Sequence, residues 1–143
     1  MGFAAIEANI RGMRHPIDLW HDVVTRRDAG ALDALLADDV VFHSPVVHSP
    51  QQGKPITKLY LGAALQVLNN ASFRYVRQVV GQSDAVLEFT TEVDGIHING
   101  VDLIHWNAEG KIDDFKVMVR PLKAINLLHS LMKQMLERMS PPG

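Results

Sequence analysis

The side chain with the clearest chemical potential in this chain is Asp102, which lies in a predicted strand from Ile96 to Trp106. It shares strand parity with apolar or small residues, namely Ile98, Gly100, Ile104 and Trp106, so we expect its carboxyl on the apolar face. Loss of water disfavours the anion and raises the pKa, and a neutral acid can donate a hydrogen bond to a ligand oxygen. Two alternatives stay open: a buried acid capped by backbone donors, or an outward turn at a bulge.

Two further polar side chains are candidates for the same task. Trp20 lies on the inward stripe of a helix predicted from Pro16 to Arg27, and its indole N–H is a donor that cannot ionise. It could join Asp102 in holding a ligand carbonyl, although a tryptophan on a helix is more often a core residue. Tyr60, on a helix predicted from Pro55 to Leu68, needs a partner for its hydroxyl if it is buried, and a pocket is one place to find it.

A group that moves a proton is harder to identify. Ser44 would need an adjacent base to act as a nucleophile, and strand alternation places His43 on the opposite face. His48 follows in a loop, titrates near neutrality and could fold over a pocket mouth. We take His48 or a bound water as the candidate, with His43 as a second choice and solvated surface histidines as the alternative. His129 is interpreted as structural or solvated.

Composition excludes several other classes of function. The 143 residues include no cysteine, so thiolate chemistry and cysteine zinc sites are absent. His43 and His48 repeat a His-Ser-Pro triplet, but the prolines break any aligning helix and no third ligand follows. We therefore expect no metal and no cofactor. With 14 basic and 16 acidic residues the net charge is -2, which gives no electrostatic case for nucleic acid or a membrane surface. A cytoplasmic protein is expected.

The elements that must position these residues form one domain over residues 1–143, without a linker or a repeat. Residues 1–15 are a weakly amphipathic lead-in. The helical period predicts helices in the first half, and period 2 predicts four consecutive strands in the second half. The predicted segments are helices over 16–27, 31–37 and 55–68, a strand over 40–42, a loop over 45–53, strands over 73–82, 84–93, 96–106 and 111–119, and a helix over 121–139. This order predicts an α+β fold, with helices packed on one face of a curved sheet.

The same residues show a resemblance to a known family. Ala37-Asp38-Asp39 with Ser44-Pro45-Val46 matches an A-D-D followed by D-P-V in bacterial ketosteroid isomerases. The segment 101–107 followed by Gly110-Lys111-Ile112 is similar to their I-D-H-F-R-F-N and G-K-V. Over about residues 15–120 the chain therefore resembles the nuclear transport factor 2-like superfamily and its SnoaL-like members. The resemblance implies a cone-shaped curved antiparallel sheet packed against N-terminal helices, with the last helix as an addition.

The resemblance also implies site residues and a reaction. Asp102 corresponds to the aspartate that stays protonated and donates to the substrate oxygen. Trp20 stands where the isomerases have a tyrosine, and Ser44 where they have the general base, so only one of three positions is retained. The implied function is proton transfer next to a carbonyl, isomerase- or cyclase-like, on a mostly apolar small molecule. The alternative is a non-catalytic binding or dimerisation module. The expected ligand contacts are Ser44, Tyr60, Phe89, Ile104, Trp106 and Phe115.

The outer sheet face carries a second expectation. Val101 and Leu103 alternate with the pocket side and would leave apolar area exposed in a monomer. Homodimers formed sheet to sheet are common in the superfamily that the chain resembles, so a homodimer through this face is expected. The final helix either caps the pocket or joins that contact.

Overall fold

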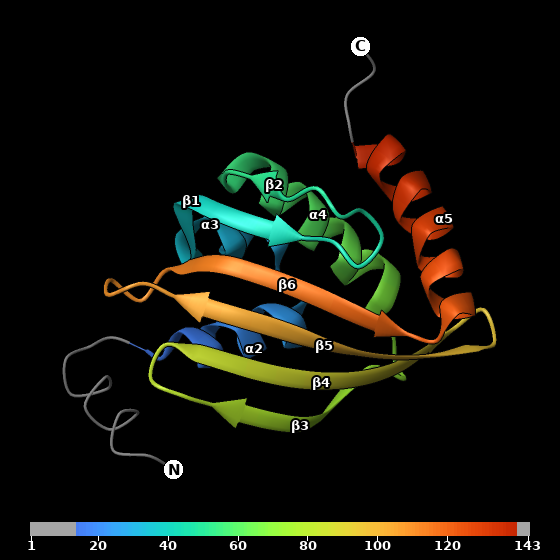
Figure 1. Cartoon of the computed structure of the whole chain (residues 1–143), viewed down its shortest axis with the longest axis horizontal. Coiled ribbons are helices and arrows are strands. Elements are labelled where there is room, and N and C mark those ends of the chain that lie inside the picture. The colour runs from blue at the N-terminus through green and yellow to red at the C-terminus, as the bar shows by residue number, and fades with distance from the viewer. Residues whose placement is uncertain (1–13, 140–143) are drawn as a thin grey trace.

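The computed structural model describes residues 14–139, so most of the expected lead-in lies outside the described residues. Helices and strands follow one another in the predicted order, except that the predicted loop 45–53 contains a short strand, and Figure 1 shows the sheet with helices behind it. The elements are α2 (Pro16–Arg26), the 3-10 helix η1 (Ala29–Ala31), α3 (Leu32–Leu35), β1 (Leu36–His43), β2 (Gln51–Gln52), α4 (Lys54–Leu68), β3 (Arg74–Val80), β4 (Asp84–Val93), β5 (Ile96–Trp106), β6 (Ile112–Arg120) and α5 (Leu122–Met139). The fold is α+β, as predicted.

The sheet has six strands in the order β2-β1-β6-β5-β4-β3. Strands β3 to β6 form the predicted antiparallel meander, and β2 is antiparallel to β1. The sequence pattern does not predict the direction of the first strand, and in the structure β1 runs parallel to β6. The long connection through α4 and the other strands makes this direction possible, since parallel neighbours need a crossover of a dozen or more residues.

The hairpin of β4 and β5 fixes the face on which Asp102 lies. Its turn residues Asp94 and Gly95 have φ of 50° and 78°, the left-handed conformation that two-residue hairpins favour. Pairing then runs without a shift from Val93 and Ile96 to the far end of both strands, so there is no bulge at Gly100. The period-2 prediction for Asp102 therefore holds, and its carboxyl lies on the inner face.

The core lies between the inner face of the sheet and the helices. Helices α2 and α4 cover this face, while the outer face of the meander carries no helix in the part of the chain described (Figure 1). Helix α5 rises from the end of β6 and packs against α4. None of the helices within residues 14–139 combines the length and apolar character needed to cross a bilayer.

The short second helix ends earlier than its apolar spacing indicates. Helix α3 stops at Leu35, and Leu36 takes the extended conformation that opens β1. Leu36 pairs with Ile112 of β6, and both side chains are fully buried. Pairing across the sheet therefore overrides the helical preference of residues 36 and 37.

Candidate functional site

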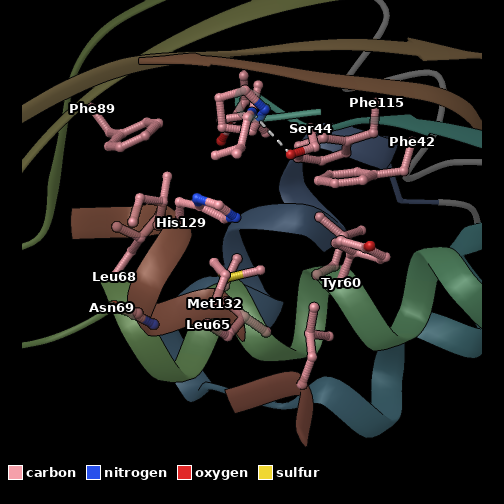
Figure 2. Close-up of a pocket in the computed structure, with 18 of the residues that line it drawn as sticks. Phe42, Ser44, Tyr60, Leu65, Leu68, Asn69, Phe89, Phe115, His129 and Met132 are labelled. Atoms are coloured by element: carbon pink, nitrogen blue, oxygen red, sulfur yellow. Dashed lines mark hydrogen bonds between the residues drawn. The ribbon is translucent and has the colours of Figure 1, made fainter. Parts of the chain in front are cut away.

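A cavity of about 410 Å³ opens between the inner face of the sheet, α4 and α5. Its walls are mostly aromatic and aliphatic, with a few polar groups (Figure 2). This volume is in the range of small-molecule pockets, which usually exceed 300 Å³. The aromatic and polar side chains that line it include Trp20, Phe42, Ser44, Tyr60, Asn69, Phe73, Tyr75, Phe89, Asp102, Phe115, His129, Lys133 and Glu137.

Asp102 is the buried acid of this cavity. It lies on β5 opposite Leu87 of β4 and Val117 of β6, with 5% of its surface exposed. Burial raises the pKa of its carboxyl from 3.8 to about 7, and a hydrogen bond from Tyr75 acts in the opposite direction. Near neutral pH the carboxyl is therefore protonated in a large part of the molecules.

Tyr75 on β3 joins Asp102 to the first helix. Its hydroxyl donates to Asp102 Oδ2 over 2.5 Å and accepts from Trp20 Nε1 over 2.9 Å. Burial, followed by the negative charge of Asp102, raises the pKa of Tyr75 well above 10, so the phenol stays neutral. The three side chains form one chain of hydrogen bonds, in which Trp20 donates to Tyr75 and Tyr75 donates to Asp102. The indole N–H of Trp20 is therefore bound to Tyr75 and is not left open to a ligand.

The remaining carboxyl oxygen of Asp102 is available to a ligand. Tyr75 occupies Oδ2, while Oδ1 has no hydrogen bond to any other residue within 14–139. A protonated Oδ1 can donate to a carbonyl oxygen, and an ionised one can accept from a hydroxyl. At neutral pH the site can therefore support a carbonyl on which negative charge develops.

Four of the predicted ligand contacts line the cavity: Ser44, Tyr60, Phe89 and Phe115. The Ser44 hydroxyl accepts from the backbone N–H of Val46 over 3.0 Å, so it also shapes the loop after β1 (Figure 2). Phe89 lies against Gly100 on the neighbouring strand, where a Cβ atom would overlap its ring. Gly100 therefore lets this aromatic wall form.

The other predicted residues do not reach the cavity. Ile104 and Trp106 are buried on the correct face but are absent from the lining, because β5 carries them past it at about 3.3 Å a residue. Trp106 packs edge-on against His15 at the start of α2. His48 lies in the exposed loop after β1, outside the lining, and His43 points away to Asp114, 2.9 Å distant.

Tyr75 is not among the site residues predicted from the sequence, and His129 is interpreted there as structural or solvated, yet both line the cavity. Tyr75 follows Phe73 at the strand period, and this parity could have placed both on the inner face. His129 lies beside Leu128 and three residues before Met132 on the predicted helix, but a helical period alone does not show which side faces a cavity. Figure 2 shows its imidazole directed from α5 into the pocket.

Clusters that could hold a metal do not occur within residues 14–139. The outer-face histidines His43, His97 and His105 instead lie against single carboxylates, as in the contact of His105 Nδ1 with Asp113 over 2.5 Å. This hydrogen bond raises the pKa of His105 and occupies its Nδ1 atom.

The chain matches known proteins over most of its length. The model of the SnoaL-like domain matches residues 17–115. A steroid delta-isomerase from Pseudomonas aeruginosa has 35% sequence identity and a TM-score of 0.82, with 86% of this chain and 90% of that chain covered. A bacterial protein with a cystatin-like fold from Silicibacter pomeroyi has 35% identity and a TM-score of 0.77, with 83% of each chain covered.

A more distant structure supports the fold alone. The epoxide hydrolase/cyclase-like enzyme SalBIII, described for pyran ring formation in the polyether salinomycin, has 16% identity and a TM-score of 0.57, with 73% of this chain and 90% of that chain covered. No curated protein sequence matches the chain. The family match and the two structures at 35% identity agree with the observed fold, and the chain belongs to the SnoaL-like family of the nuclear transport factor 2-like superfamily.

Proposed function

We propose that this protein binds a mostly apolar small molecule in the cavity and catalyses proton transfer at a carbon next to a carbonyl. The observation that carries the proposal is Asp102, a buried acid with one oxygen held by Tyr75 and the other facing the cavity. An acid that keeps its proton near neutral pH is suited to hold an oxygen that becomes negative.

The aromatic lining favours a flat substrate that contains rings. Phe42 and Tyr60 lie with ring centroids 5.5 Å apart, and Phe73 stacks on Phe89 at 5.3 Å, so opposite walls present ring faces and edges. The isomerase from Pseudomonas aeruginosa acts, by its name, on steroids, which are apolar compounds with fused rings. A cyclic ketone or enone is the substrate class that fits both observations.

The reaction would proceed through an enol or dienol. A bound base or water removes the proton beside the carbonyl, and the electron pair of the C–H bond forms a C=C bond. The carbonyl oxygen gains the charge and receives a hydrogen bond from Asp102, which Tyr75 and Trp20 keep in place. Return of the proton to another carbon completes an isomerisation. One such donor accounts for about 10²–10³-fold in rate.

Proton exchange in D₂O tests this function without a known substrate. Proton NMR would follow loss of the hydrogens next to the carbonyl of 1-tetralone and 2-cyclohexenone. We expect the wild-type protein to speed exchange and Asp102→Ala to lose about 10²–10³-fold of that rate. Exchange that is equal in wild type and Asp102→Ala would contradict the proposal.

A binding module without chemistry is the second candidate, and the position of Ser44 favours it. Its hydroxyl is engaged by backbone N–H groups, and its lining neighbours Pro45 and Val46 carry no base. Native mass spectrometry of the protein purified from its own cells distinguishes the two functions. A retained ligand that is released unchanged, together with no exchange on any ketone, would favour binding alone.

We also propose that the outer sheet face forms a homodimer. Val79 pairs with Val86, and Val86 with Leu103, so these apolar side chains form a row across three strands. Val101 pairs with Met118 in the adjacent row of the same face, and Met118 is 51% exposed. Sedimentation of the wild type should give a dimer.

Substitutions on and off this face test the homodimer. Val101→Lys combined with Met118→Lys should give a monomer, because two charges would replace apolar contacts. Leu122→Lys is the control, since Leu122 is also exposed but lies on α5. A wild type that sediments as a monomer would contradict the dimer. The cytoplasmic location expected from the sequence remains part of this proposal, and cell fractionation would test it.

A further inference from the structure

Proton transfer beside a carbonyl needs a group that accepts the proton, and this group must reach the same cavity as Asp102. The cavity lining contains Asp102 and Tyr75 on the sheet, Tyr60 on α4, and His129, Lys133 and Glu137 on α5. Tyr75 and Asp102 are bound to each other. The usual ammonium form of lysine has no acceptor site, and a tyrosine hydroxyl already carries a proton, so neither residue type is suited to take one. Histidine and glutamate remain as residue types that can accept a proton, and histidine is the type that most often takes and returns one in catalysis. Their positions along α5 decide between His129 and Glu137.

His129 is placed to take the proton by the path of α5. The helix begins at Leu122, directly after β6, so its first turns lie beside the sheet and its later turns lie farther from it (Figure 1). Lys133 and Glu137 follow His129 by one and two turns on the same face, about 6 and 12 Å farther along the helix. His129 is therefore the member of this stripe that lies nearest to the sheet.

The imidazole of His129 is also free to bind a substrate. It points from α5 into the pocket, towards the space bordered by Ser44, Phe89 and Tyr60 (Figure 2). The histidine rings with hydrogen-bond partners are those of His15, His21, His43 and His105. Within residues 14–139 the ring of His129 has none, so both of its nitrogens remain available.

We propose that His129 is the catalytic residue that accepts and returns the proton, on the wall of the cavity opposite Asp102. This inference rests on the proposed function, because it supplies the base for that reaction. It differs from the base positions considered in the sequence, since His48 and His43 lie outside the cavity lining.

The step balances within the substrate and this one side chain. The lone pair of a neutral His129 nitrogen takes the proton from the carbon beside the carbonyl. The C–H electron pair becomes the C=C bond of the enol, and the carbonyl π pair moves to the oxygen held by Asp102. The imidazolium then gives a proton back to carbon, either at the far end of a conjugated system or, after its N–H has exchanged with D₂O, at the original carbon, which is the exchange that the assay measures. No oxidant, reductant or second reactant is needed.

The test compares His129→Gln with His97→Gln in the exchange assay on 1-tetralone. His97 is an exposed histidine at the start of β5, far from the cavity lining, so its variant controls for loss of a histidine. General bases contribute about 10²–10⁴-fold in rate, so we expect a loss of at least about 100-fold in His129→Gln and no change in His97→Gln. A rate equal to wild type in His129→Gln would overturn the inference, as would the same loss in His48→Gln.

A second measurement separates a missing base from a damaged pocket. Binding of 2-naphthol, whose hydroxyl can meet Asp102, should stay within about twofold of wild type in His129→Gln, because the acid is intact. In His129→Ala, added 4-methylimidazole should restore part of the exchange rate. Loss of 2-naphthol binding together with no rescue would overturn the assignment. Absence of exchange in the wild type would instead refute the proposed function.

Discussion

The two walls of the cavity differ in how firmly they hold their polar groups. On the sheet wall, Asp102 is buried and Tyr75 is half-buried, and both belong to one hydrogen-bonded chain with the buried Trp20 of α2. On the helix wall, the exposed side chains His129 and Lys133 make no side-chain hydrogen bond to another residue within 14–139. The difference teaches that the sheet wall holds its acid by burial and hydrogen bonds, while the polar side chains of α5 stay open to solvent and to a ligand.

The largest effect should come from removing the ionisable carboxyl of the sheet wall with Asp102→Asn. The folded pKa of Asp102, about 7, lies above its ordinary 3.8, so the folded state holds the proton longer than the unfolded state. The contribution of this bound proton to the stability of the folded state is complete below about pH 4 and is lost as the pH rises through 7. At 1.36 kcal/mol per pKa unit, the loss is on the order of 4 kcal/mol in the free energy of unfolding.

Urea unfolding at pH 4.5 and pH 8 measures this difference. The wild type should lose stability between these values relative to Asp102→Asn, because asparagine cannot ionise. Asp38→Asn is the control, since the Asp38 side chain is fully exposed. Equal pH slopes for wild type and Asp102→Asn would show that the sheet wall imposes no unusual charge state.

The next effect should come from Gly100→Ala, which crowds the rigid wall. An added Cβ would overlap the ring of Phe89 and lie 2.8 Å from the carbonyl oxygen of Met118, which is backbone and cannot yield easily. We expect a loss of about 1–3 kcal/mol in the free energy of unfolding.

Gly62→Ala, on α4 where it packs against α5, is the matched control. A Cβ there would lie 3.4 Å from Met139 Cε, the end of a flexible side chain on α5. Because alanine favours a helix over glycine, this variant should be as stable as wild type or more so. Equal losses from the two substitutions would contradict the contrast between the walls.

A smaller effect is expected from Tyr75→Phe, which removes the middle of the hydrogen-bonded chain. The N–H of Trp20 would lose its acceptor, and we expect a loss of about 1–2 kcal/mol in the free energy of unfolding. The pKa of Asp102 should rise further, because the Tyr75 bond lowers it. Tyr60→Phe is the control, and a greater loss there, measured by urea unfolding, would contradict this assignment.

The smallest effects should come from Lys133→Gln and Glu137→Gln at the outer end of the helix wall. Both side chains are exposed, so each substitution should change the free energy of unfolding by less than about 0.5 kcal/mol. Thermal unfolding at neutral pH measures this. A cost above about 1 kcal/mol would mean that the helix wall holds its polar groups more tightly than its geometry shows.

The sheet wall could be predicted from sequence to a large extent, because a strand has a strict period of two. The bounds of β4 and β5 and the inward face of Asp102 follow from alternation and from the Asp94-Gly95 turn. Tyr75 obeys the same alternation, but its bond to Asp102 depends on β3 and β5 curving round a shared space. A sequence pattern does not encode that approach.

The helix wall could be predicted much less well. The apolar spacing of residues 122–139 locates α5, but the rotation of the helix depends on its packing against α4, where Gly62 admits Met139. This rotation brings His129 into the cavity. Side-chain packing also determines where the cavity ends along β5. For this reason the strand period alone does not show that Ile104 and Trp106 lie outside the lining.

The most direct test of the central claim is a titration of the Asp102 carboxyl carbon by ¹³C NMR, assigned with Asp102→Asn. The account predicts a pKa of about 7 in the free protein, because burial disfavours the anion. A carboxyl that titrates near the ordinary value of about 4 would be an anion at neutral pH. It could not donate to a ligand oxygen, and the proposed chemistry would be contradicted.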